Sequence, residues 1–184
     1  RVELKNTTVK TPGKIEIEAY TSREWTGQDN DRITTEDVQT GSDNVVRLEK
    51  TKLLNAAPAE ANQALKWVYV RGGKVEIKDS ELTSDHSVDV WALKSAKVKH
   101  YTTLEEYHTD ASNSVEISNS KLHANLASWN TYKKPDCYVS AWGGKVALMG
   151  VDIKAPRDVF VYALREANSE ETADGDKGEI KSDT

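Results

Sequence analysis

A single segment occurs three times in this chain, and this repetition constrains the fold more than any other feature. The segment Lys74–Lys94, KVEIKDSELTSDHSVDVWALK, aligns without a gap with the segments that begin at Arg1 and at Lys145. Its anchor pairs are thirteen residues apart in every copy, at Val2 and Ile15, Val75 and Val88, and Val146 and Val159. Partial copies begin at Val46 and Val115. A unit that recurs every 30–40 residues or so indicates a repeat architecture.

Within the central copy, apolar or small side chains alternate with polar ones, as in strands with one buried face. The predicted inward face carries Val75, Ile77, Ser80, Leu82, Ser84, Val88, Val90 and Ala92, and the outward face carries Glu76, Lys78, Glu81, Thr83, Asp89 and Trp91. Strands this short cannot bury an apolar face alone, but stacked copies can. We therefore predict an all-β fold, a right-handed parallel β-helix (solenoid) of about five rungs, one rung being one turn of the chain.

Superimposing the five copies predicts continuous rows of side chains along the stack. Two inward rows are apolar in every copy: Leu4, Leu48, Ile77, Ile117 and Leu148, and Val9, Leu53, Leu82, Leu122 and Ile153. A corner row carries hydroxyls in four copies: Thr7, Thr51, Ser80 and Ser120, followed by Val151. On the outside, Lys52, Glu81, Lys121 and Asp152 alternate in sign. Such cross-strand charge pairs add only about 0.2–1 kcal/mol each, so we interpret this row as a solvated face.

Between the rungs the chain makes excursions of unequal length, which we expect to be loops. They run from Thr21 to about Asn44, from Asn55 to Leu65 with a short helix predicted over Pro58 to Leu65, from Lys97 to Asn113, and through the charged stretch SEETADGDKG after rung five. The last residues, beginning at Gly178, are similar to the opening of another rung. We therefore interpret residues 1–184 as a single β-helix segment, a fragment of a longer repeat protein.

Composition argues against several classes of partner. The net charge of −5 and the pI near 5.5 give no indication of nucleic-acid binding. No apolar run approaches the length of a membrane span, so membrane insertion is not expected. His100 and His108 lie in one excursion, but exposed loop histidines are usually solvated, and Asp89 has no carboxylate neighbours in its predicted row. The sequence therefore predicts no metal, no cofactor and no catalytic residue.

The pattern V-x-I-x-x-S-x-L-x-S, a short polar corner and then V-x-V-x-A resembles the β-helix repeats of filamentous-haemagglutinin-type adhesins. These are exoproteins of Gram-negative two-partner secretion, and the resemblance is strongest over residues 1–20, 74–96 and 145–167. It implies a non-enzymatic segment of a secreted adhesin at the bacterial cell surface. The implied partners are an outer-membrane transporter during secretion and a glycan or protein receptor on a host or neighbouring cell.

A second family of interpretations stays open, because the long, unequal excursions and the low glycine content depart from the adhesin pattern. Other proteins with this fold act on carbohydrates, as polysaccharide lyases, hydrolases or phage tailspikes. Screening purified protein against sugars would separate the two: release of product favours an enzyme, and retention without cleavage favours adhesion.

Aromatic residues provide the candidate binding site. Trp91 and Tyr162 occupy the same outward position of the repeat, and Trp129 falls near it in rung four. Either the excursions fold back and cover these rings, or the rings form an exposed strip for sugar or protein binding. The predicted binding residues are Tyr101, Tyr107, Trp129, Tyr132, Trp91 and Tyr162. If the excursions are loops, trimming residues 97–112 should leave the stack intact.

Overall fold

The structure is a computed structural model that describes residues 1–27, 34–56, 67–99, 104–125, 138–156, 158–172 and 175–181. Regular structure in these residues consists of β-strands, which form three parallel sheets of five strands and one further sheet of six. The helix predicted over Pro58 to Leu65 lies outside the described residues. The prediction of an all-β fold is confirmed for the part of the chain that the structure describes.

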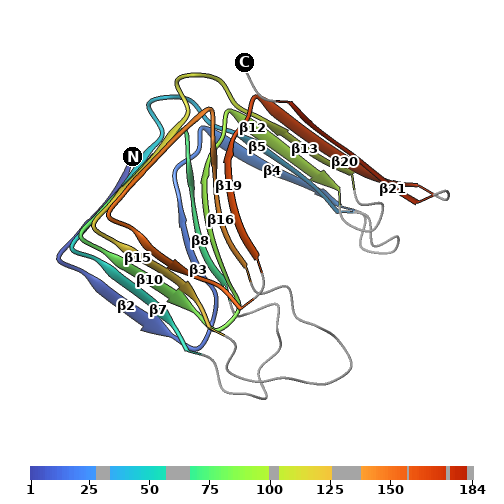
Figure 1. The fold of residues 1–184 in the computed structure, drawn as a ribbon. Helices are drawn as coiled ribbons and strands as arrows, with labels where there is room; N and C mark the ends of the chain where they lie inside the picture. Colours follow the sequence, from blue (N-terminus) through green and yellow to red (C-terminus); the bar gives the residue numbers. More distant parts are fainter. Residues whose placement is uncertain are drawn as a thin grey trace.

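The three parallel sheets are built by successive strands of each turn of the chain. Sheet A contains β1 (Val2–Lys5), β6 (Val45–Glu49), β9 (Lys74–Lys78), β14 (Ser114–Ser118) and β17 (Lys145–Met149). Sheet B contains β2 (Thr8–Thr11), β7 (Lys52–Asn55), β10 (Glu81–Ser84), β15 (Lys121–Ala124) and β18 (Asp152–Lys154). Sheet C contains β3 (Ile15–Glu18), β8 (Trp67–Gly72), β11 (Ser87–Ala92), β16 (Tyr138–Gly143) and β19 (Asp158–Ala163). Figure 1 shows the three sheets as the sides of a triangle around a shared interior, an arrangement consistent with the predicted coil.

The predicted inward rows form the core of this triangle. Backbone pairing places Leu48 beside Ile77 in sheet A, and Leu82 beside both Leu53 and Leu122 in sheet B. These side chains are buried, and they pack in one cluster with the inward valines of sheet C. The register inferred from the repeat is therefore confirmed in both rows.

The corner between sheets A and B depends on one unusual backbone position in each rung. Asn6, Lys50, Asp79, Asn119 and Gly150 all have positive φ, between 47° and 62°. Asn, Asp and Gly tolerate this left-handed region better than other residues. The residue that follows each of these positions belongs to the predicted hydroxyl row. In rung three, for example, Ser80 Oγ donates to the carbonyl of Lys78 at 2.7 Å and accepts the backbone N–H of Thr51 at 3.0 Å. The row therefore satisfies turn amides, as its composition predicts.

The prediction that the excursions are loops was wrong for three of them. They form the hairpins β4 (Ser22–Gly27) with β5 (Thr34–Gln39), β12 (Ser95–Lys99) with β13 (Leu104–His108), and β20 (Glu166–Thr172) with β21 (Gly175–Lys181). All six strands pair antiparallel in one sheet, sheet D. The segment from Gly178, expected to open another rung, belongs to β21. Polar residues on both faces concealed the alternation in these strands, and the hairpins satisfy their backbones by pairing with one another.

In the part of the chain that the structure describes, hairpins follow rungs one, three and five, and strand spacing explains this alternation. Neighbouring strands lie about 4.8 Å apart in any sheet, so two rungs rise by the same distance as one two-stranded hairpin. A hairpin on every second rung therefore stacks continuously on the next. This match explains why the strongest sequence repeat spans two rungs, with Val2, Val75 and Val146 separated by 73 and 71 residues.

Each of the repeated Gly-Gly corners contacts the segment that leads from a hairpin back to the stack. A Cβ on Gly73 would lie 1.7 Å from the carbonyl oxygen of Gly41, and a Cβ on Gly144 would lie 1.9 Å from that of Asp110. Both distances are far below van der Waals contact, so a side chain cannot be accommodated without moving the backbone. Glycine at these two positions is required by the close approach of the segment that follows each hairpin.

Substitution in a core row tests the register. Leu82 is fully buried between Leu53 and Leu122, so Leu82→Ala should lower the free energy of unfolding by about 2–5 kcal/mol. Glu81→Ala changes the outward neighbour, which forms an exposed ion pair with Lys52 at 3.5 Å, and should cost less than about 1 kcal/mol. Denaturant unfolding measures both, and equal losses would contradict the register.

Candidate binding cleft between sheets C and D

The outward face of sheet C carries two rows of polar, charged and aromatic side chains. Backbone pairing gives one row of Glu18, Arg71, Trp91, Trp142 and Tyr162, and a second of Glu16, Tyr69, Asp89, Ser140 and Phe160. Trp91 and Tyr162 therefore occupy equivalent positions, as predicted. The aromatic residue of rung four in this row is Trp142, whereas Trp129 lies outside the described residues. The insertion before β16 separates Trp142 from the rest of its rung in sequence, which is why the repeat alignment missed it.

The hairpin sheet covers part of this aromatic row. Val38, Leu93, Ala96, Tyr107 and Leu164 form a second buried cluster at the junction of sheets C and D, and Trp91, Val98, Trp142 and Tyr162 pack against it. Of the two interpretations of the outward rings, the covering of the rings by the excursions is the one that the structure shows. Because Tyr107 of the second hairpin belongs to this cluster, trimming residues 97–112 would remove its ring and uncover the cluster. The segment is therefore a hairpin and not the loop that the expectation from the sequence assumed, and the effect of the trimming on the stack stays a prediction.

The predicted binding residues have different outcomes. Tyr107 is buried, with an exposed fraction of 6%, and Trp91 and Tyr162 are half-buried beside it. The structure thus brings Trp91, Tyr107 and Tyr162 to one junction. Tyr101, Trp129 and Tyr132 lie outside the described residues.

The rings at the junction make a tightly packed group. Trp91 and Trp142 stack with their centroids 4.9 Å apart and their planes 15° from parallel. Tyr107, from sheet D, lies edge-on to both, at 5.3 Å and 5.6 Å. Tyr69 lies edge-on to Trp91 at 5.0 Å. These are the favourable geometries for aromatic pairs, worth about 0.5–1.5 kcal/mol each beyond burial, so the group fixes the angle between sheets C and D.

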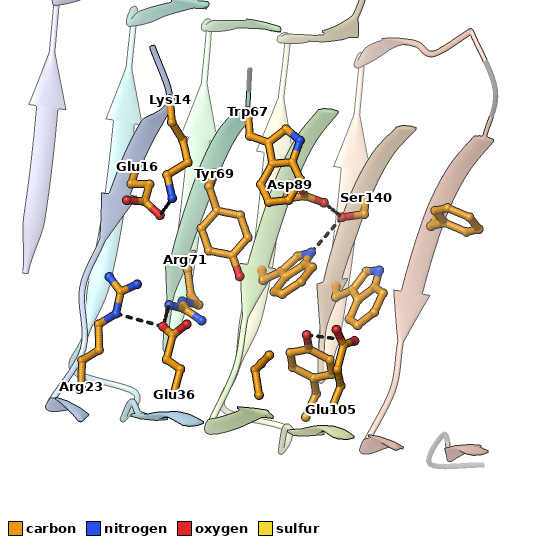
Figure 2. A pocket seen from close by; sticks show the side chains of 15 residues that line it. Lys14, Glu16, Arg23, Glu36, Trp67, Tyr69, Arg71, Asp89, Glu105 and Ser140 are labelled. Atoms are coloured by element: carbon orange, nitrogen blue, oxygen red, sulfur yellow. Dashed lines mark hydrogen bonds and ion pairs between the residues drawn. The ribbon is translucent and has the colours of Figure 1, made fainter. Parts of the chain in front are cut away.

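Beyond the junction the two sheets diverge and leave a cavity of about 510 Å³. It is lined from sheet C and its flanks by Lys14, Glu16, Trp67, Tyr69, Arg71, Asp89, Trp91, Ser140, Trp142 and Phe160, and from sheet D by Arg23, Glu36, Val98, Glu105 and Tyr107. Figure 2 shows the charged residues near β3 and β8 at one end, and Asp89 with Ser140 further along the row of strands. Most of these residues were not predicted from the sequence. The alternation Trp67-Val-Tyr69-Val-Arg71 was the available signal, since it places three large side chains on one outward face.

Four charged residues join the sheets at one end of the cavity. Arg71 contacts Glu18 at 2.7 Å and Glu36 at 3.1 Å, and Arg23 contacts the same two carboxylates at 2.7 Å and 2.9 Å. Desolvation acts to lower the pKa of Arg71, but the influence of Tyr69, Glu18 and Glu36 outweighs it and raises the pKa. Two arginines and two glutamates balance in charge, so this end of the cavity is a closed ionic network that attaches the first hairpin to sheet C.

Asp89 lies at the middle of the cavity in a chain of hydrogen bonds. The Nε1–H of Trp91 donates to Ser140 Oγ at 2.8 Å, and the Ser140 hydroxyl donates to the Asp89 carboxylate. Asp89 is only 2% exposed. Burial raises the pKa of its carboxyl to about 7, although the hydrogen bond from Ser140 acts to lower it. The carboxyl is therefore a group that changes charge near neutral pH, a property that its predicted place on the outward face did not indicate.

The indole of Trp142 lacks the hydrogen bond that its neighbour makes. Trp91 donates to Ser140 in the next strand, and the corresponding residue one strand further is Phe160, which has no acceptor. The Trp142 Nε1–H is buried and has no hydrogen-bond partner in the described ranges. A buried donor without an acceptor costs about 1–3 kcal/mol.

The described residues contain neither a metal-binding cluster nor a membrane-spanning helix. Within the described ranges, no group of three or more histidine, cysteine, aspartate or glutamate side chains is arranged to hold a metal ion. Nor does that part of the chain contain a helix with the length and apolar character needed to cross a bilayer. His108 lies in β13, and His100 falls outside the described residues. The cavity is therefore the candidate site that the geometry supports best.

The buried carboxyl predicts a pH-dependent stability. Between the ordinary pKa of 3.8 and about 7, the folded chain keeps a proton on Asp89 that the unfolded chain has released, so the free energy of unfolding falls as the pH rises through this interval and levels off above it. Asp89→Asn removes this dependence. Denaturant unfolding at pH 4 and pH 8 should show the unmodified protein losing up to about 4 kcal/mol more than the variant. Parallel pH profiles would contradict the prediction.

Comparison of the chain with protein-family models, with curated proteins and with solved structures finds no match. The resemblance to filamentous-haemagglutinin-type repeats therefore stays a prediction.

Proposed function

We propose that this chain is a non-enzymatic, glycan-binding segment of a secreted bacterial surface adhesin, built as a right-handed parallel β-helix. The glycan binds in the cleft between sheets C and D. One observation carries the proposal: a cavity of about 510 Å³ lined by aromatic rings together with hydrogen-bonding carboxylates. Apolar walls with a few fixed polar groups are the usual composition of a site for a small ligand.

The size and shape of the cavity favour a glycan over a protein receptor. A stable protein interface buries about 800 Å² on each partner, mostly over a broad surface. A recess between two sheets suits a narrow ligand, such as one or two sugar units of a chain. The C–H faces of sugars pack on aromatic rings, and their hydroxyls donate to carboxylates such as Glu105.

The fold supports an adhesive role by making the cleft rigid. One wall is a strand row of the main stack, and the other is a continuous sheet of three paired hairpins. Both walls are fixed to each other by the aromatic junction and by the ionic network of Arg71, Glu18, Arg23 and Glu36. A preorganised cleft loses little conformational entropy on binding.

Binding to a glycan panel tests the proposal. Trp67 lines the cavity and is 37% exposed, so Trp67→Ala should reduce affinity for the retained glycan about 10- to 30-fold, as expected for an interfacial tryptophan. Tyr20 is 42% exposed and does not line the cavity, so Tyr20→Ala is a matched control that should bind as the unmodified protein does. Calorimetry or surface-based titration measures both.

The proposal fails if the purified protein retains no glycan, or if the two variants bind equally well. Circular dichroism of each variant should be unchanged, because both rings lie at the surface and outside the two buried clusters.

A carbohydrate-active enzyme is a second candidate, favoured by Asp89. A carboxyl whose pKa is raised to about 7 inside a cleft can act as a proton donor near neutral pH. Incubation with oligosaccharides should then release product, and Asp89→Asn should reduce the rate at least about 100-fold. Retention of the intact oligosaccharide without product supports the adhesive function instead.

A further inference from the structure

We propose that the aromatic part of the cleft binds a cationic ammonium group carried by the glycan, either the free amine of an amino sugar or a choline-type substituent. This inference rests on the proposed function and defines the class of ligand more narrowly. The juxtaposition that carries it is a pair of carboxylates, Asp89 and Glu105, in a cavity whose other walls there are aromatic rings.

The charges around the cavity are unevenly matched. Each cation in its lining already has a carboxylate partner: Lys14 contacts Glu16 at 2.7 Å, and Arg23 and Arg71 both contact Glu36. Neither Asp89 nor Glu105 forms an ion pair within the ranges that the structure describes. Asp89 accepts a hydrogen bond from Ser140, and Glu105 accepts one from Tyr107 at 3.3 Å. Above the pKa of Asp89, where its carboxyl is ionised, the aromatic part of the cavity therefore has an excess of negative charge.

The two carboxylates approach the cavity from opposite walls. Asp89 lies in β11 of sheet C, and Glu105 lies in β13 of sheet D (Figure 2). A carboxylate in an apolar recess is costly unless a positive charge compensates it. An anionic ligand would add to the repulsion, and a neutral ligand would leave it uncompensated. A bound cation between the walls would interact favourably with both carboxylates.

The surrounding rings favour the same ligand. The face of an aromatic ring attracts a cation within about 6 Å of its centroid, and groups of rings are the usual site for quaternary ammonium ions. This cavity already contains one such contact, because the guanidinium of Arg71 lies 5.1 Å from the centroid of the Tyr69 ring. Trp67, Trp91 and Phe160 also line the cavity.

Titration of Asp89 adds a distinguishing property. Its carboxylate form increases as the pH rises through about 7, so affinity for a permanently charged cation should rise over the same interval. The other charged or titratable groups that line the cavity are Lys14, Glu16, Arg23, Glu36, Tyr69, Arg71, Glu105 and Tyr107. Comparison with Asp89→Asn separates the contribution of Asp89 from theirs.

The experiment uses two matched pairs of probes with the whole chain. One pair is choline and its uncharged isostere, in which a quaternary carbon replaces the nitrogen; the other is a glucosamine oligosaccharide and its N-acetylated counterpart. We expect at least about tenfold tighter binding of the cationic member, and the pair that shows this preference identifies the source of the ammonium group. The preference for choline should increase between pH 6 and pH 8.

Three variants assign the effect to residues. Asp89→Asn and Glu105→Gln should each abolish most of the preference, and Asp89→Asn should also remove its pH dependence. Glu106→Gln is the control, because Glu106 is the next residue of β13 and lies on the opposite face of sheet D from Glu105. It should keep the full preference.

Equal binding of the charged and uncharged members in both pairs would overturn the inference, as would a preference that survives in both Asp89→Asn and Glu105→Gln. Neither result affects the proposed function, which is judged separately by glycan retention and by Trp67→Ala. Conversely, loss of glycan retention with an intact preference for choline would overturn the proposed function and leave the cation site in place.

Discussion

The equal spacing of strands in every β-sheet is the constraint on which the rest of this structure depends. Because a hairpin contributes two strands, it rises along the stack by about two strand spacings, which is the height of two rungs. Hairpins on alternate rungs can therefore pair into one continuous sheet beside the main stack. A hairpin on every rung would need twice the available height. The alternation of two rung types is thus a geometric requirement of sheet D.

The cleft follows from this second sheet. Sheet C would otherwise present Trp91, Trp142 and Tyr162 to solvent, and sheet D covers them near the junction and diverges beyond it. Burial between the two sheets is what raises the pKa of Asp89 to about 7. The same residue on a free outward face would be an ordinary solvated carboxylate. The chemistry of the site therefore arises from the packing of sheet D against sheet C, and no strand of either sheet has it alone.

The repeat in the sequence was sufficient to predict the main stack in detail. The rows through Leu48 and Leu82 and the hydroxyl row through Ser80 all have the predicted register. These predictions succeeded because each rung pairs with a copy of itself, so that alignment of the copies is also alignment in space. The candidate site was predicted only in part. Trp91, Tyr107 and Tyr162 meet at the junction, whereas Tyr69, Ser140 and Trp142 were missed because insertions interrupt the repeat before β8 and β16.

The sequence by itself determined which residues face the interior, because a two-residue alternation with identical neighbours above and below leaves one register that buries the apolar rows. The sequence did not determine the structure of the excursions. Their strands carry polar residues on both faces, and they pair with hairpins about sixty residues away, as Ala96 does with Val38 and Tyr107 does with Ala167. Only the tertiary structure decides such pairings, because each hairpin gains its partner and its buried face from the stack that positions it.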